Sequence, residues 1–154
     1  MANVIRCFLP GEPPTCTKQQ RKYRVVTPKG GKAFATSYKE KKVADAEQSL
    51  LAKFLPFKPD KPLEGPLGVL VTFRFTRPKS HTKKQRKSIA KTTKPDLDNA
   101  EKLLFDAISG VAFLDDKQIW TKESSKTWCD DNIAPGIILC IYETDPLNGE
   151  DRGH

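Results

Sequence analysis

The segment LGVLVTFRFT, residues 67–76, carries the clearest β-strand pattern in the chain. Every second side chain in it is strongly apolar, and these are Val69, Val71, Phe73 and Phe75. Side chains alternate between the two faces of a strand, so these four share one face. The other face is mixed and becomes basic at Arg74. The segment therefore predicts a strand that buries one face in the core.

Upstream of this strand, the sequence predicts a further strand and a hairpin. Apolar residues favour a strand over residues 3–9, and the prolines of PGEPP end it because proline has no backbone N–H to donate. Two short β-type runs, at 23–27 and 32–36, flank the sequence PKGG. Two glycines between such runs indicate a β-hairpin.

Two helices are predicted, one on each side of this strand in the sequence. Ser37 and Glu40 match a capping box, and the apolar spacing after them predicts a helix over residues 37–55. The second helix must begin after Pro95, because proline disfavours helix at the residue before it. Gly110 suits its end. Its apolar stripe consists of Leu97, Ala100, Leu103, Leu104, Ala107 and Ile108.

The remaining segments complete one small domain. Residues 77–95 predict a basic loop with one or two helical turns, and 117–128 and 136–143 predict two strands. The C-terminal stretch lacks core residues and leans acidic. We therefore expect one domain over 1–143, followed by a flexible acidic tail over 144–154.

Composition limits the class of protein. No apolar run approaches the roughly 20 residues that cross a bilayer, and the N-terminus shows no secretion-signal pattern. We expect a cytoplasmic protein with no membrane partner. The cysteines form no C-x-x-C pair, so we expect reduced thiols rather than disulfides or a zinc site. They are Cys7, Cys16, Cys129 and Cys140.

Basic residues are unevenly placed along the chain. The net charge is +8, from 27 Lys and Arg against 19 Asp and Glu. Residues 74–94 hold nine Lys or Arg and no acid, and residues 17–42 hold another nine against Glu40 alone. A charge run is often only a solvated surface. Two such segments also indicate a polyanionic partner, of which nucleic acid is the commonest.

The motif KPDLDN, residues 94–99, places Asp96 and Asp98 at the start of the second helix. One aspartate there needs no special explanation, because it suits a helix cap and the positive end of the helix dipole. A second acidic pair, Asp115 and Asp116, lies where the next strand begins. A helix followed by a return strand can bring the two pairs together. Carboxylates held close to one another need a cation or a proton between them.

Mg²⁺ fits this pattern, because it takes oxygen ligands and keeps several waters, so two or three carboxylates suffice. A calcium-binding EF-hand loop is excluded, since Glu101 and Ala107 occupy the positions of its essential glycine and glutamate. Lys102 follows Asp98 by four residues, so both lie on one face of the predicted helix. Lys102 can form an ion pair with Asp98, worth roughly 0.2–0.5 kcal/mol. Alternatively, it can serve as a cation beside a scissile phosphate. A metal-dependent nuclease typically places acidic metal ligands beside basic surfaces that bind the phosphate backbone.

The segment KPDLDNAEKLLFDAISGVAFLDDKQIW, residues 94–120, resembles the signature of RusA-type Holliday junction resolvases. The shared features are Asp-x-Asp-Asn, a lysine four residues after the second aspartate, Asp-Ala in mid-helix, a glycine at the helix end and Asp-Asp-x-Gln-Ile. The stretches GEPPTCTKQQRKYR and FTRPKSHTKK resemble, more loosely, the proline-rich start and the basic loop of that family. The resemblance covers most of residues 4–143.

The resemblance implies an α+β fold, in which a small mixed β-sheet packs with two main helices in a single domain that forms a homodimer. It implies an endonuclease that depends on Mg²⁺, with Mn²⁺ as a substitute, and a bacterial or phage origin. Such an enzyme nicks four-way DNA junctions in symmetric pairs, and we expect 5′-phosphate ends. The implied metal ligands are Asp96, Asp98 and Asp116, with Asp115 as the lesser candidate. Lys102 is implied as essential beside them.

DNA contacts are expected from both basic segments. The candidate residues are Lys18, Arg21, Arg77, Lys79, Lys83, Lys84, Arg86, Lys87 and Lys94. We assign no catalytic task to His81. Trp120 and Trp128 lie eight residues apart on one predicted strand, which favours core or dimer packing over base stacking.

Three other functions are compatible with these patterns. A nuclease of the same fold can prefer forks, flaps or other branched DNA. A non-catalytic DNA-binding module, in which the aspartates only cap a helix, would neither nick DNA nor gain stability from metal. A basic protein that binds acidic partners would show no preference for branched DNA.

Overall fold

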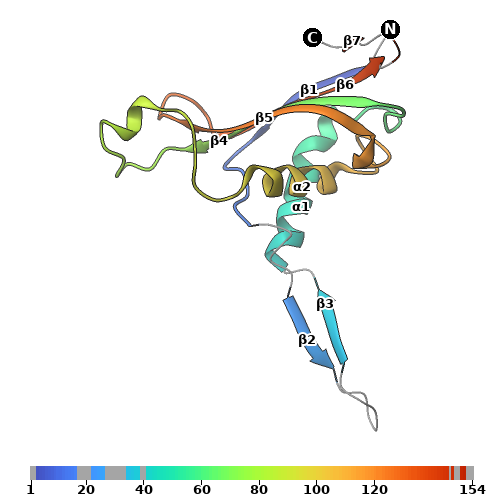
Figure 1. The fold of residues 1–154 in the computed structure, drawn as a ribbon, viewed down its shortest axis with the longest axis horizontal. Coiled ribbons are helices and arrows are strands. Elements are labelled where there is room, and N and C mark those ends of the chain that lie inside the picture. The colour runs from blue at the N-terminus through green and yellow to red at the C-terminus, as the bar shows by residue number, and fades with distance from the viewer. Residues whose placement is uncertain are drawn as a thin grey trace.

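The computed structural model describes residues 3–16, 22–26, 34–38, 41–145, 147 and 150–151. For residues 22–26, 34–38 and 150–151 it describes the backbone alone. Figure 1 shows a main β-sheet with both α-helices on the same side of it. Within the described residues, no helix is long and apolar enough to cross a membrane.

The main sheet is mixed. Its strands lie in the order β1-β6-β4-β5, and β6 runs antiparallel to both of its neighbours, whereas β4 and β5 are parallel. A parallel pair needs a crossover connection, which the second helix provides. The α+β fold predicted from the sequence is confirmed. The strands are β1 (Val4–Pro10), β4 (Leu67–Thr76), β5 (Ile119–Cys129) and β6 (Gly136–Asp145).

Strand β4 has the bounds that the sequence predicts. It lies between β6 and β5, so both of its edges are paired. The four apolar side chains that alternate along it are all buried in the core. Burying each contributes roughly 1.5–3 kcal/mol. The alternation read from the sequence therefore correctly identifies the helix-facing side of the central strand.

The helices are α1 (Lys41–Phe54) and α2 (Leu97–Ile108). The apolar stripe predicted for α2 is buried except at Leu97, which is half-buried. The predicted start of the first helix is wrong, because Ser37 belongs to a strand and pairs with Tyr23 there. A local capping pattern is weaker than a ladder of strand hydrogen bonds, and the helix begins only at Lys41.

The predicted hairpin is confirmed as β2 (Lys22–Val26) and β3 (Phe34–Tyr38), an antiparallel pair that forms its own small sheet. Figure 1 shows it projecting from the main body next to α1. A 3-10 turn, η1 (Leu55–Phe57), follows α1. The basic loop contains one 3-10 turn, η2 (Gln85–Lys87), as expected.

The C-terminal end of the sheet extends beyond the predicted boundary. Strand β6 continues to Asp145, and its last residues pair with a short strand, β7 (Glu150–Asp151). The boundary expected between 143 and 144 therefore falls inside β6. Most of the remaining tail lies outside the described residues, so its flexibility stays a prediction.

Replacing a buried residue of α2 should destabilise the fold. Leu104 is 0% exposed, so Leu104→Ala leaves a cavity and should lower the free energy of unfolding by about 2–5 kcal/mol. Leu114→Ala is the matched control, because Leu114 is 57% exposed and should change stability by less than about 0.5 kcal/mol. Urea denaturation measures both values. Equal destabilisation of the two variants would contradict this assignment of the core.

Candidate active site

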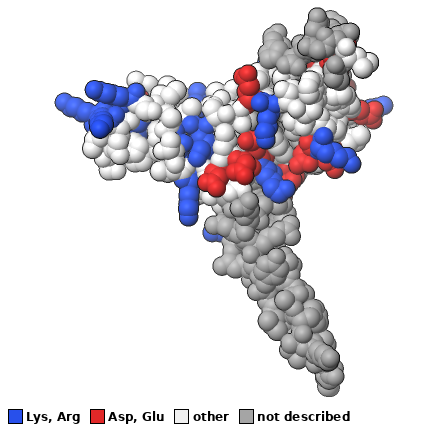
Figure 2. Space-filling model, in the orientation of Figure 1, with Lys and Arg blue, Asp and Glu red and all other residues white. Residues whose placement is uncertain are grey.

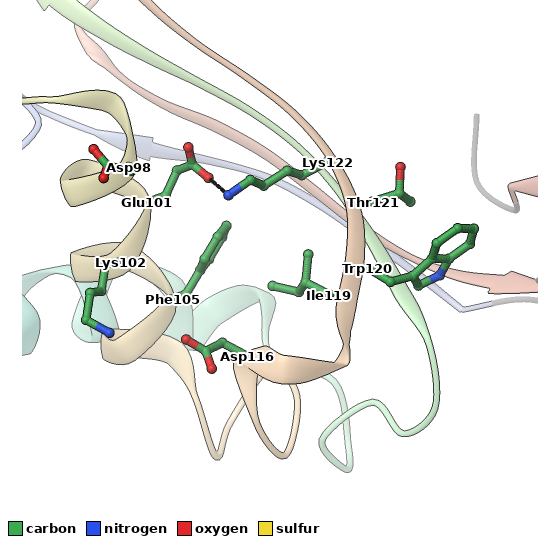
Figure 3. Close-up of a pocket in the computed structure, with 9 residues that line it drawn as sticks. All are labelled: Asp98, Glu101, Lys102, Phe105, Asp116, Ile119, Trp120, Thr121 and Lys122. Atoms are coloured by element: carbon green, nitrogen blue, oxygen red, sulfur yellow. Dashed lines mark ion pairs between the residues drawn. The ribbon is translucent and has the colours of Figure 1, made fainter.

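A pocket of about 380 Å³ opens between α2 and β5. Two of the three acids predicted as metal ligands, and the predicted catalytic lysine, line the same pocket (Figure 3). Its lining residues are Asp98, Glu101, Lys102, Phe105, Asp116, Ile119, Trp120, Thr121 and Lys122. The first four belong to α2, Asp116 opens the 3-10 turn η3 (Asp116–Gln118), and the others belong to β5.

Asp96 and Asp98 lie at the N-terminus of α2. Asp96 occupies the N-cap position, but its side chain makes no cap hydrogen bond. Asp98 is exposed in the first turn and lines the pocket. The positive end of the helix dipole stabilises both carboxylates. Capping by the side chain therefore does not explain why the sequence places two acids here.

The two members of the second acidic pair have different surroundings. The Asp115 carboxylate accepts a hydrogen bond from the backbone N–H of Lys117 at 2.9 Å, which caps η3. This hydrogen bond lowers the pKa of Asp115. Asp116, in contrast, is half-buried and lines the pocket. The geometry favours Asp116 over Asp115 as the group that faces a bound ion.

Gln118, two residues after Asp116, holds the turn η3 in place through side-chain hydrogen bonds. Its side-chain oxygen accepts a hydrogen bond from the backbone N–H of Asp115 at 2.8 Å. Its side-chain nitrogen donates to the backbone oxygens of Leu63 and Gly65, both at 3.0 Å. These contacts attach η3 to the segment before β4, and so they hold Asp116 at the pocket.

The electrostatic surroundings of Asp116 raise its pKa. Burial is the largest cause, followed by a hydrogen bond with Asp115 and the negative charges of Asp106 and Asp115. The positive charge of Lys102 opposes them. Crowded carboxylates of this kind are stabilised by a nearby cation.

Glu101 is a pocket residue that sequence reasoning missed. Its side chain is buried, with 4% of the residue exposed, and accepts a hydrogen bond from the Ser124 hydroxyl at 3.0 Å. It also forms an ion pair with Lys122 at 2.5 Å, drawn in Figure 3. Glu101 follows Asp98 by three residues, so helical spacing alone places both on one side of α2. Only the packing of α2 against β5 shows that Glu101 is buried there.

The chemistry of the donors fits a divalent metal. Asp98 and Asp116 bring carboxylate oxygens to the pocket, and such oxygens are the ligands that Mg²⁺ prefers. The Glu101 carboxylate is already bound by Ser124 and Lys122. In the part of the chain that the structure describes, no three His, Cys, Asp or Glu side chains form a group that could hold a metal ion. Asp96 does not line the pocket. The structure therefore brings Asp98 and Asp116 to one pocket without joining them to Asp96 in a closed cage.

Arg77 differs from the other basic residues proposed to contact DNA. Its side chain is buried, with 4% of the residue exposed. The guanidinium forms an ion pair with Asp130 at 2.9 Å and donates to the backbone oxygens of Gln85 and Ser88. A buried charge needs such partners. The expectation that Arg77 contacts DNA is therefore corrected: Arg77 shapes the basic loop from inside.

The exposed cations of the loop form a separate surface. Figure 2 shows Lys and Arg gathered over the end of the molecule that carries this loop, and Asp and Glu gathered near α2. Lys18 and Arg21 lie outside the described residues. The proposed DNA-contacting residues that the structure shows as exposed are Lys79, Lys83, Lys84, Arg86, Lys87 and Lys94.

The two tryptophans have different surroundings. Trp128 packs against the ammonium group of Lys91, 4.2 Å from the ring centre, and its ring lies perpendicular to that of His81. Trp120 is 53% exposed, and its indole N–H donates to the Thr144 hydroxyl at 2.7 Å. Trp128 thus takes part in packing at the base of the basic loop, whereas Trp120 lies outside the core.

A family model described as Endodeoxyribonuclease RusA matches residues 10–142. The matched range contains every residue that lines the pocket. No curated protein matches the chain.

Asp115 and Asp116 should respond differently to mutation in the presence of EDTA. Asp115→Ala removes the cap of η3 and should lower Tm at pH 7. Folding raises the pKa of Asp116, so its charged form destabilises the fold at neutral pH. Asp116→Asn should therefore raise Tm at pH 7, and this gain should vanish below pH 3.8, the ordinary pKa of the group.

Thermal melts between pH 3 and pH 8 measure this difference. Asp131→Asn is the control, because Asp131 is exposed in the turn between β5 and β6. A loss of stability at pH 7 in Asp116→Asn, equal to that of Asp115→Ala, would show that both acids serve only the turn.

Proposed function

Since the chain belongs to the RusA endodeoxyribonuclease family, we propose that it is a Mg²⁺-dependent resolvase of four-way DNA junctions. The family makes the protein an enzyme that hydrolyses phosphodiester bonds of DNA, which excludes a purely DNA-binding or protein-binding role. The observation that carries the finer proposal is the pocket shared by Asp98, Lys102 and Asp116. We propose that the enzyme makes symmetric paired nicks with 5′-phosphate ends.

The residues of the pocket divide into two roles. Asp98, from α2, and Asp116, from η3, would hold the metal. Asp96 would join them as the third ligand if its side chain turned toward the pocket, which it does not line in this structure. When bound, Mg²⁺ would supply a Lewis acid for the phosphate and lower the pKa of an attacking water. Lys102 lies close enough to Asp116 for its positive charge to oppose the rise in the pKa of that carboxyl, of which burial is the largest cause. A lysine at this place stabilises the negative charge that develops on the scissile phosphate.

The basic loop would bind the DNA arms. Its exposed lysines and Arg86 neutralise phosphates, so affinity should depend steeply on salt. A four-way junction has two equivalent scissile positions related by a two-fold axis. A homodimer with the same symmetry places one pocket at each position, which supports the proposal of a dimeric enzyme.

Replacing the pocket aspartate should separate binding from cleavage. Asp98→Asn preserves side-chain size and removes the charge, so it should lower the rate of junction cleavage in Mg²⁺ by roughly 100-fold or more. Junction affinity in EDTA should remain within about two-fold, because phosphate contacts dominate affinity. A nicking assay on a synthetic four-way junction and a gel-shift titration measure the two quantities.

The control for this experiment is Asp131→Asn, which should cut at the wild-type rate. Cleavage by Asp98→Asn at the wild-type rate would contradict the proposal that Asp98 binds the metal. Forked DNA, a flap and plain duplex should be tested in parallel with the junction. Faster cutting of forks or flaps than of junctions would replace the resolvase proposal with a nuclease for other branched DNA.

The exposed loop lysines should contribute to the salt dependence of binding. The double variant Lys83→Met, Lys84→Met should reduce the slope of log K against log salt by about 0.9 for each phosphate that it no longer neutralises. Lys58→Met is the control, because Lys58 is exposed on the connection between η1 and β4. Fluorescence anisotropy between about 50 and about 200 mM salt measures the slopes. Equal slopes for all three proteins would place the DNA elsewhere.

A further inference from the structure

Strand β5 presents three polar residues to α2 at alternate positions. Alternate side chains share one face of a strand. These three lie opposite β4 residues that are buried beneath the helices, so they lie on the helix-facing side of the sheet. The residues are Lys122, Ser124 and Lys126, and their β4 partners are Val69, Val71 and Phe73.

Lys126 attaches the backbone that precedes α2 to β5. Its ammonium group donates hydrogen bonds to the backbone oxygens of Thr93 at 2.7 Å and Pro95 at 2.6 Å. Hydrogen bonds from a charged donor are short and roughly twice as strong as those between neutral groups. Asp96 follows Pro95 directly, so Lys126 holds the segment from which Asp96 and Asp98 extend.

Glu101 attaches the second turn of α2 to the same strand. Its buried carboxylate binds the Ser124 hydroxyl and the Lys122 ammonium group. The helix start is thus held on both sides of Asp98, at Pro95 before it and at Glu101 after it. These contacts fix the position and the rotation of the first turn relative to β5.

Strand β5 also fixes the position of Asp116. The turn η3, which Asp116 opens, runs directly into the first residue of β5. Strand β5 therefore sets the positions of both aspartates. It positions Asp116 through the turn η3, and it positions Asp98 through the β5 side chains that bind α2. The separation of the two carboxylates depends on how firmly α2 is attached to β5.

We propose that Lys126, and the ion pair of Glu101 with Lys122, are positioning residues that set the affinity of the pocket for a divalent metal. This inference rests on the proposed function, because it takes Asp98 and Asp116 as metal ligands. Groups that orient metal ligands typically change metal affinity by roughly 10–100-fold when they are removed. The same lysines have an alternative role, in which they neutralise DNA phosphates directly.

Removal of the Lys126 ammonium group tests the proposal. Lys126→Met should raise the Mg²⁺ concentration at half-maximal junction cleavage by about 10-fold or more. In metal-free protein, amide hydrogen exchange of residues 93–100 should become faster, while that of α1 stays unchanged. Lys126→Arg should restore much of the Mg²⁺ response, because a guanidinium can also donate to two carbonyl oxygens.

The salt dependence of junction binding in EDTA distinguishes positioning from DNA contact. If Lys126 positions α2, the slope of log K against log salt should not change in Lys126→Met. A slope reduced by about 0.9, with normal exchange of residues 93–100, would assign Lys126 to DNA and overturn the proposal. An unchanged Mg²⁺ midpoint together with unchanged exchange would overturn it as well. Lys58→Met should match the wild type in all three measurements.

A second variant covers the case in which Lys126→Met fails to fold. Glu101→Gln keeps the size of the side chain and removes the ion pair with Lys122, so it should also raise the Mg²⁺ midpoint by about 10-fold. A wild-type midpoint in Glu101→Gln would overturn the role of this pair. If the wild-type protein showed no Mg²⁺-dependent cleavage, the proposed function would fail. Hydrogen exchange of metal-free Lys126→Met would still decide whether Lys126 positions α2.

Discussion

Burial of the apolar stripe of α2 is the constraint on which the candidate active site depends. Leu103, Leu104 and Ile108 are almost wholly buried, and each contributes roughly 1.5–3 kcal/mol by leaving water. Their burial fixes the rotation of the helix about its axis. The neighbouring strip of α2, with Asp98 and Lys102, is then directed toward the pocket beside β5. A small rotation would cost core burial before it moved the acids away.

The basic residues serve two physical purposes that net charge alone does not separate. Arg77, Lys122 and Lys126 each bind a carboxylate or backbone oxygens of the protein itself. Lys91 is buried against aromatic rings, and burial is the main cause that lowers its pKa. The lysines of the loop that remain exposed are the ones suited to phosphates. The folded loop thus depends on internal cations for its shape and leaves other cations exposed on its surface.

The acidic residues near the pocket also divide into those that bind other groups of the protein and those that line the pocket. Asp115 caps a turn and Glu101 pairs with a lysine, whereas Asp98 and Asp116 face the pocket. Adjacent residues of identical type, Asp115 and Asp116, have pKa values shifted in opposite directions because one accepts a backbone hydrogen bond and the other is partly desolvated. The surroundings of each carboxylate, and not the number of acids, therefore decide which of them line the pocket.

The sequence by itself determined the central strand at 67–76, the second helix after Pro95 and the acids at its start, because periodicity and proline act locally. Motif spacing also suggested that the acids at 96–98 and 115–116 approach one another, and the structure brings Asp98 and Asp116 to one pocket. Only the tertiary structure decided that Arg77 is internal and that Glu101 and Lys126 attach α2 to β5. It also showed that Ser37 lies in a strand. Those outcomes depend on contacts between residues distant in the sequence, whose free energies exceed local preferences.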